Sequence, residues 1–313
     1  MTETQSSILL LTLGSFGLLI ALTFLGEVFR ARVPEGETDP AAEVYMTRVQ
    51  SWWSMVAVLG LALLLGKVGL MIVMGFASFA ALREFLTFTV KTKADHISLA
   101  LAFFFVLPFQ YVLVGLEWHR IYAVFIPVYV FLLLPIISAL RGNPDRFLVR
   151  VAETQWGLMI CVYCVSQVPA LVTLDIPGYG DRAILLVAFL VTVVQLGDLL
   201  EYFFGRRVGR HRIAPGLSPK TWEGVGIGVL CAMVIGMLLH WITPFTVLGA
   251  AAMAGVISLA GMMGNLVIAA IKRDRKVKDW SHLIPGQGGF VDQLDSVIFA
   301  APVMFHLTRL TMT

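Results

Sequence analysis

Long apolar segments constrain the fold of this chain most strongly. Hydrophobic residues make up 58% of the 313 positions and charged residues only 14%, and the mean hydropathy is +0.85. Such a composition leaves too few polar side chains to cover a soluble domain. The charged residues cluster between apolar runs, most of which approach the ~20 residues that a membrane-spanning helix needs. The sequence therefore predicts an all-α polytopic integral membrane protein.

We expect about ten transmembrane helices with a cytoplasm-facing polar cavity. The predicted spans are 7–28, 52–66, 68–88, 97–117, 121–140, 149–173, 183–204, 225–243, 246–270 and 289–308. The second and third spans could instead form one re-entrant unit. The first apolar run lacks a basic leading segment and a small-residue cleavage site, so we interpret it as a true helix rather than a signal peptide. We expect 1–313 to form a single membrane domain, with N-terminal helices over 1–180 and a motif-bearing part over 181–313.

Basic residues are concentrated in alternate connections between these spans. The connections after spans one, three, five, seven and nine contain Arg30, Arg32 and Arg48; Arg83, Lys91 and Lys93; Arg141, Arg146 and Arg150; Arg206, Arg207, Arg210, Arg212 and Lys220; and the basic residues of 272–278. The other connections hold little beyond Lys67, Arg120 and Arg182. Because positive residues remain on the cytoplasmic side, we expect the basic loops to face the cytoplasm, in a bacterial inner membrane.

The connection between the last two spans carries the clearest chemical pattern. It reads KRDRKVKDWSHLIPGQGGFVDQLDS over residues 272–296. Five basic residues precede a glycine-rich turn, and the turn leads into Asp292 and Asp295, which share a helix face because they are three residues apart. Cations, flexible backbone N–H groups and paired acids in one short segment indicate a metal–polyphosphate site.

A second polar cluster lies at the end of the seventh span. Asp198 and Glu201 are three residues apart in an apolar helix, where one acid costs ~2.5–3.5 kcal/mol on insertion scales. Such acids normally face a polar cavity, a cation or a basic partner. The alternative to a functional site is a buried structural ion pair with Arg206, Arg207 or Arg210.

The segment that follows this helix offers groups suited to phosphate. A turn that contains proline carries two hydroxyls and an ammonium group, from Ser218, Thr221 and Lys220. These groups suit a phosphate-binding site. The alternative is a basic loop that docks on anionic lipids.

Several motifs occur in a fixed order over the last third of the chain. They are GD at 197–198, YFFGRRVGRHRIAP at 202–215, SPKTWEG at 218–224, GNL at 264–266, IKRD at 271–274, VKD at 277–279, PGQGG at 285–289 and DQLDS at 292–296. In the order, spacing and placement of these motifs the chain resembles the phosphatidate cytidylyltransferase family, also called CDP-diacylglycerol synthases. SWWSM at 51–55 and LREFL at 82–86 look like a divergent branch of it.

The resemblance implies a reaction of phospholipid biosynthesis. A cytidylyl group would pass from CTP to phosphatidate, or to a related lipid phosphate, to give CDP-diacylglycerol and pyrophosphate. The attacking phosphate is already an anion, so the protein needs no Ser or Cys nucleophile; it must hold two polyanions together and offset their charge. The resemblance implies Mg²⁺, with a second cation as an option. Membrane lipids and a homodimer are further expected partners, whereas nucleic acid is not, because the basic loops lie against the membrane.

Site residues follow from these motifs as hypotheses. The expected metal ligands are Asp292 and Asp295, with help from Asn265. Lys278 and Asp279 join the two aspartates in the expected catalytic set. The expected substrate and phosphate contacts are Asp198, Ser218, Lys220, Thr221, Lys272, Arg273, Gly288 and Gly289.

The chain departs from the family pattern where the chemistry takes place. Asn265 replaces the usual acid, Gln287 the usual histidine and Gln293 the usual arginine, while Ile268 and Ala269 replace a Glu-Ser pair. An uncharged Asn265 should weaken metal affinity, and Gln293 cannot neutralise a phosphate. Transfer to another lipid phosphate and a weakened or non-catalytic relative therefore stay open. A transporter is a further alternative because intramembrane acids also mark ion pathways.

Overall fold

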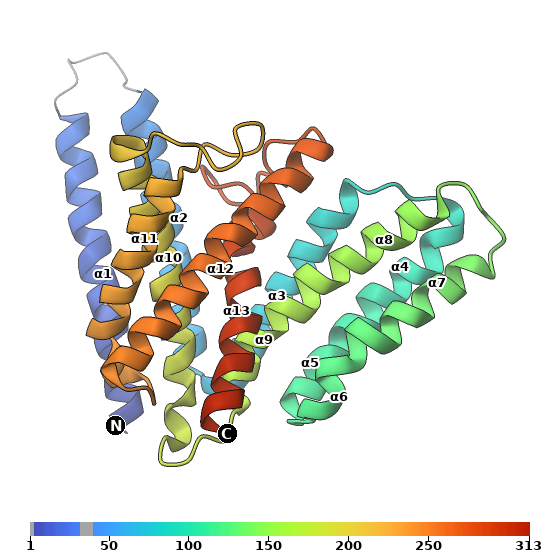
Figure 1. Cartoon of the computed structure of the whole chain (residues 1–313), viewed down its shortest axis with the longest axis horizontal. Coiled ribbons are helices and arrows are strands. Elements are labelled where there is room, and N and C mark those ends of the chain that lie inside the picture. Colours follow the sequence, from blue (N-terminus) through green and yellow to red (C-terminus); the bar gives the residue numbers. More distant parts are fainter. Residues whose placement is uncertain (1–2, 32–39) are drawn as a thin grey trace.

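The computed structural model describes residues 3–31 and 40–313, and this part of the chain is built from helices (Figure 1). Its only strand-like pairings are two isolated bridges, Arg212 with Thr221 and Ile284 with Gly288. The α-helices are α1 Glu3–Arg30, α2 Pro40–Leu64, α3 Gly66–Thr87, α4 His96–Leu101, α5 Leu107–Gly115, α6 His119–Val124, α7 Phe131–Ala139, α8 Phe147–Leu158, α9 Val165–Ala170, α10 Ile184–Val208, α11 Trp222–Leu238, α12 Val247–Asp274 and α13 Phe290–Met312. The predicted all-α fold is confirmed.

Short π-helical segments join some of these helices into longer units. Ala102–Val106 connects α4 to α5, Phe125–Val130 connects α6 to α7, and Met159–Cys164 connects α8 to α9. Short 3₁₀ turns cover Lys93–Asp95, Leu171–Thr173, Gly180–Ala183 and His240–Ile242.

Eight helical units in the described residues are long and apolar enough to cross a membrane. They correspond to the predicted spans except 52–66 and 225–243, so the chain is an integral membrane protein, but the count of ten is not confirmed. The first half of α2 mixes polar residues, including Glu43, Arg48 and Gln50, with apolar ones, and α11 has only 17 residues. The helices α2 and α3 have 25 and 22 residues and are separated by the single residue Leu65. The predicted second and third spans are therefore two distinct helices, and whether they form a re-entrant unit stays a prediction.

The basic connections gather at one end of the bundle. The α3–α4, α7–α8, α10–α11 and α12–α13 connections lie at the upper end in Figure 1, while both termini mark the lower end. This arrangement agrees with the predicted alternation of basic and neutral connections. Arg32, which belongs to the first basic connection, lies outside the described residues.

The last four long helices, α10 to α13, pack against one another and form the part of the bundle that carries the motifs. Helix α13 also packs against α3 and α9 from the N-terminal half. Its apolar side chains Ile298, Met304 and Phe305 are fully buried. The start of α13, where Asp292 and Asp295 lie, is therefore held between both halves of the chain.

A buried ion pair stabilises the N-terminal helices close to the α3–α4 and α7–α8 connections. The Nε atom of Arg150 lies 2.9 Å from Oδ2 of Asp95, and the two side chains are 0% and 5% exposed. Burial acts to raise the pKa of Asp95, but hydrogen bonds from Thr92, Ser138 and Arg150 outweigh it and hold the pKa below its usual value. This pair contributes stability only while Asp95 is ionised.

Replacing Asp95 by alanine should therefore destabilise the protein strongly. It leaves the Arg150 guanidinium buried without its partner, which is expected to lower the free energy of unfolding by about 3–5 kcal/mol. Because the folded pKa is depressed, the wild-type contribution is present above about pH 4 and is lost as the pH falls through the folded pKa. Thermal unfolding in detergent measures the effect, with the exposed Asp145→Ala as control. Equal unfolding temperatures for the two variants would contradict the expectation.

Candidate functional site

Three long helices bring oxygen-bearing side chains into contact near the basic end of the bundle. Asn265 on α12 donates from Nδ2 to both carboxylate oxygens of Asp198 on α10, at 3.2 and 3.3 Å. The hydroxyl of Ser296 on α13 contacts the Asp198 carboxylate and lies 2.9 Å from Oδ1 of Asn265. Asp295 joins through its Oδ1, which accepts from the Ser296 N–H at 2.7 Å. We call Asp198, Asn265, Asp295 and Ser296 the oxygen cluster.

Lys220 borders this cluster and neutralises part of its charge. Its Nζ lies 2.5 Å from Oε2 of Glu201 and 3.6 Å from Oδ1 of Asp198. Only 13% of the Lys220 side chain and 5% of the Glu201 side chain are exposed. The carboxylates on α10 therefore hold a lysine from the Ser218–Gly224 segment against the cluster.

The basic partner of Glu201 differs from the alternative given by the sequence. Glu201 pairs with Lys220, so the alternative of an ion pair with Arg206, Arg207 or Arg210 is wrong for this residue. The guanidinium groups of Arg206 and Arg207 instead lie over the rings of Tyr202 and Phe203, 5.3 and 4.2 Å from the centroids. Helical spacing suggested the arginines, but they follow Glu201 on an exposed face, whereas Lys220 returns to it from the loop.

Asp292 is engaged at the start of α13. Its Oδ2 accepts from the N–H groups of Gly289 at 2.8 Å and Trp280 at 3.0 Å, and its Oδ1 forms an ion pair with Lys272. Gly288 has φ +88°, and a Cβ there would collide with the Asp292 carboxylate. In this structure Asp292 therefore caps the helix, and its predicted metal contact stays a prediction.

The remaining predicted residues lie around these groups. Thr221 caps α11 by accepting from the Gly224 N–H at 3.2 Å, and the Ser218 hydroxyl accepts from the Lys220 N–H at 3.3 Å. Arg273 and Lys278 are exposed and Asp279 is half-buried. Within the described part of the chain, no hydrogen bond or ion pair joins these last three residues to the oxygen cluster. Gly289 faces a different acid, Glu84, whose carboxylate a Cβ at Gly289 would overlap.

Sequence reasoning missed Ser296 and Glu84 as site residues. Ser296 ends the DQLDS motif, and Glu84 lies inside LREFL. Glu84 is an acid within a predicted span, which is the same signal that marks Asp198.

The oxygen cluster has a composition that fits Mg²⁺. The described residues contain no group of three His, Cys, Asp or Glu side chains arranged to hold a metal. However, two carboxylates, an amide carbonyl and a hydroxyl give an all-oxygen donor set, and Mg²⁺ usually takes one or two carboxylates together with substrate phosphates. Asp198 and Asp295 also repel each other at close range, which a bound cation would relieve.

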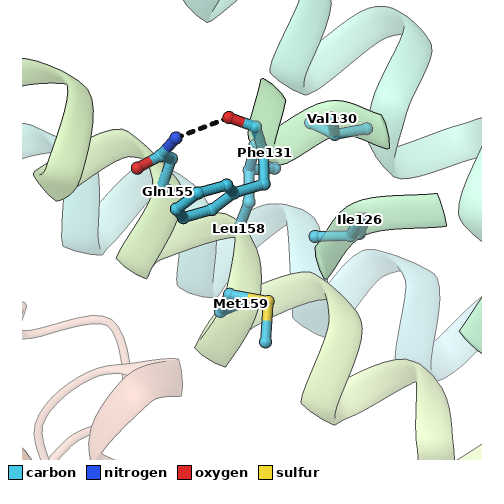
Figure 2. Close-up of a pocket in the computed structure, with 6 residues that line it drawn as sticks. All are labelled: Ile126, Val130, Phe131, Gln155, Leu158 and Met159. Atoms are coloured by element: carbon cyan, nitrogen blue, oxygen red, sulfur yellow. Dashed lines mark hydrogen bonds between the residues drawn. The ribbon is translucent and has the colours of Figure 1, made fainter. Parts of the chain in front are cut away.

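A pocket elsewhere in the structure has a different character. Figure 2 shows that this pocket has helix α8 on one side and the Phe125–Val130 segment with the start of α7 on the other. Mainly apolar side chains line it. Gln155 supplies the polar contact, an Nε2 hydrogen bond to the Phe131 carbonyl at 2.8 Å. The pocket lining contains no charged group, so this pocket does not suit a polyphosphate.

The chain is similar to known proteins over nearly its whole length. The cytidylyltransferase family matches residues 46–311. The uncharacterized protein YnbB of Escherichia coli K12 is 32% identical over 296 residues, 94% of this chain and 96% of that protein. A phosphatidate cytidylyltransferase of Staphylococcus haemolyticus is 30% identical over 161 residues, 49% of this chain and 61% of the relative. One from Haemophilus influenzae is 35% identical over 128 residues, 39% and 44% of the two chains. The matches to relatives named phosphatidate cytidylyltransferase thus span about three fifths or less of their length.

Proposed function

Since the chain belongs to the cytidylyltransferase family, and is thus a nucleotidyltransferase enzyme in a membrane, we propose that it transfers the cytidylyl group of CTP to phosphatidate. The products are CDP-diacylglycerol and pyrophosphate. The observation that carries this proposal is the convergence of Asp198, Asn265 and Asp295 from three helices, with Lys220 and Lys272 beside them. The bacterial relatives and the basic loops support a bacterial inner membrane with the site on the cytoplasmic side.

The reaction is an in-line substitution at phosphorus. An oxygen of the lipid phosphate forms a bond to the α-phosphorus of CTP, and the bond from that phosphorus to the bridging oxygen of the β-phosphate breaks. Pyrophosphate leaves with the electron pair. The catalytic task is to bring two anions together and to stabilise the charge that develops on the leaving group.

Different residues at the site carry out different parts of this task. Lys220 and Lys272 exchange their carboxylate partners for substrate phosphates, while the exposed Arg273 and Lys278 bind the outer phosphates. Asp198, Asp295 and the Asn265 carbonyl would hold Mg²⁺, which when bound would supply positive charge to the phosphates. Ser296 keeps Asp198 and Asn265 oriented through its hydroxyl.

A second candidate is CTP-dependent transfer to a different lipid phosphate. Gln293 favours it, because its amide brings no positive charge and donates instead to the Gln287 carbonyl at 3.1 Å. A lipid acceptor whose phosphate needs less charge neutralisation at position 293 would tolerate this uncharged amide.

Radiolabelled CTP distinguishes these functions. Purified protein in detergent with Mg²⁺ should move label from [α-³²P]CTP, but not from [γ-³²P]CTP, into the lipid fraction when phosphatidate is present. Removing Mg²⁺ with EDTA should stop the transfer, and adding it back should restore it. Label that appears only with another lipid phosphate supports the second candidate. No labelled lipid with any acceptor rejects both.

A further inference from the structure

The connection between α12 and α13 is held in place by helices of the N-terminal half. Ser51 on α2 donates to the Pro285 carbonyl at 2.7 Å, and Arg275 pairs with Glu153 on α8 at 2.7 Å. Trp280 is buried and packs against the rings of Phe85 and Phe88 at the end of α3. Helices far away in the sequence therefore position the segment that carries Lys278, Asp279 and the glycine turn.

Glu84 on α3 makes the most direct of these contacts. Its Oε1 accepts from the Ser281 hydroxyl at 2.7 Å, and its Oε2 accepts from the Val291 N–H at 3.0 Å. Glu84 is 5% exposed. The Val291 N–H belongs to the first turn of α13, where backbone donors have no partner within the helix. Glu84 thus binds both the loop and the helix that the loop leads into.

The chemistry of this contact explains why a carboxylate is buried here. None of the ion pairs formed by the described residues includes Glu84, so its charge is compensated by hydrogen-bond donors and by the positive end of the α13 dipole. Gly289 leaves room for the carboxylate, because a Cβ at that position would overlap it. Asp292, also in the first turn of α13, accepts from the Gly289 N–H at 2.8 Å.

We propose that Glu84 is a positioning residue for the transfer reaction: it fixes the first turn of α13 and thereby sets where Asp292 and Asp295 face their partners. This inference rests on the proposed function, since that function assigns Asp295 to the reaction and gives Lys272, the ion-pair partner of Asp292, a substrate phosphate. Glu84 itself contacts no substrate in this proposal. A small displacement of reacting groups, caused by a change at a distance, lowers rates by about 10²-fold in other enzymes.

Two substitutions distinguish the effect of the two Glu84 hydrogen bonds from the effect of the Glu84 charge. Glu84→Ala removes both hydrogen bonds, and we expect kcat to fall by about 10²-fold with little change in KM for CTP. Glu84→Gln keeps both contacts, because its carbonyl accepts from Val291 and its NH₂ donates to Ser281. We therefore expect Gln to restore kcat to within about fivefold of wild type. Glu27→Ala, which changes an exposed glutamate on α1, is the control and should leave kcat unchanged.

Hydrogen exchange supplies a readout that does not depend on activity. Amides of residues 280–291 should exchange faster in Glu84→Ala than in wild type, and at the wild-type rate in Glu84→Gln. If Glu84→Ala does not fold, Ser281→Ala removes one of the two contacts and should show a smaller effect in the same direction. Unchanged kcat and exchange in the alanine variants, or equal loss of kcat in Gln and Ala, would overturn the proposal. Failure of wild type to label any lipid would instead reject the proposed function, and exchange would still decide whether Glu84 fixes the start of α13.

Discussion

Asp295→Asn is expected to lower kcat for cytidylyl transfer by about 10²–10³-fold, the loss typical of removing one preorganised electrostatic group. Asparagine keeps the size of the side chain and an oxygen that accepts from the Ser296 N–H, now 2.7 Å from Oδ1 of Asp295. It removes one of the two negative charges in the oxygen cluster. Because Asp198 and Asp295 repel each other without a cation, the same substitution should leave stability unchanged or slightly raise it.

The opposite directions of these two effects make the test specific. Initial rates with radiolabelled CTP and phosphatidate give kcat, and thermal unfolding in detergent without Mg²⁺ gives stability. Raising the Mg²⁺ concentration should recover part of the lost rate if Asp295 contributes to metal affinity. The exposed Asp145→Asn is the matched control. A kcat for Asp295→Asn within about threefold of wild type would remove Asp295 from the catalytic set.

Sequence patterns located the oxygen cluster better than they assigned its members. An acid in an apolar helix marks Asp198, the three-residue spacing to Asp292 marks Asp295, and the family motifs mark Asn265; the structure brings all three together. The shared helix face of Asp292 and Asp295 suggested one common role. The structure separates them because Asp292 lies in the first turn of α13, where free N–H groups attract its carboxylate, while Asp295 lies one turn later beside Asp198.

Contacts between distant segments were beyond the reach of these patterns. Ser281 and Glu84 are separated by 197 positions, and no local periodicity pairs them. Lys220 reaches Glu201 only because the α10–α11 connection folds back over α10. The sequence predicted the connection as a phosphate-binding segment but not the acids that hold it. Hydrophobic runs likewise predict the long helices, whereas the start of α2 at Pro40 was missed because its first half mixes charged and polar residues with apolar ones.

Asp292→Ala is expected to lose both turnover and stability. The alanine leaves Lys272 without its carboxylate partner and removes the acceptor for the Gly289 and Trp280 N–H groups. Breaking a buried pair costs about 3–5 kcal/mol, and we expect the lower end because 19% of the Lys272 side chain is exposed. CTP-dependent transfer in detergent should fall below detection. Thermal unfolding and the transfer assay measure the two losses in the same preparation.

Asp292→Asn separates the capping role of this residue from a catalytic one. The asparagine carbonyl still accepts from the two N–H groups, so the start of α13 should stay in place and the stability should lie between wild type and Asp292→Ala. If the negative charge of Asp292 acts in catalysis, either by holding a cation or by placing Lys272 against a phosphate, transfer should stay undetectable in Asp292→Asn. Wild-type turnover in that variant would leave Asp292 as a helix cap alone, and the catalytic charge at the site would then come from Asp198 and Asp295.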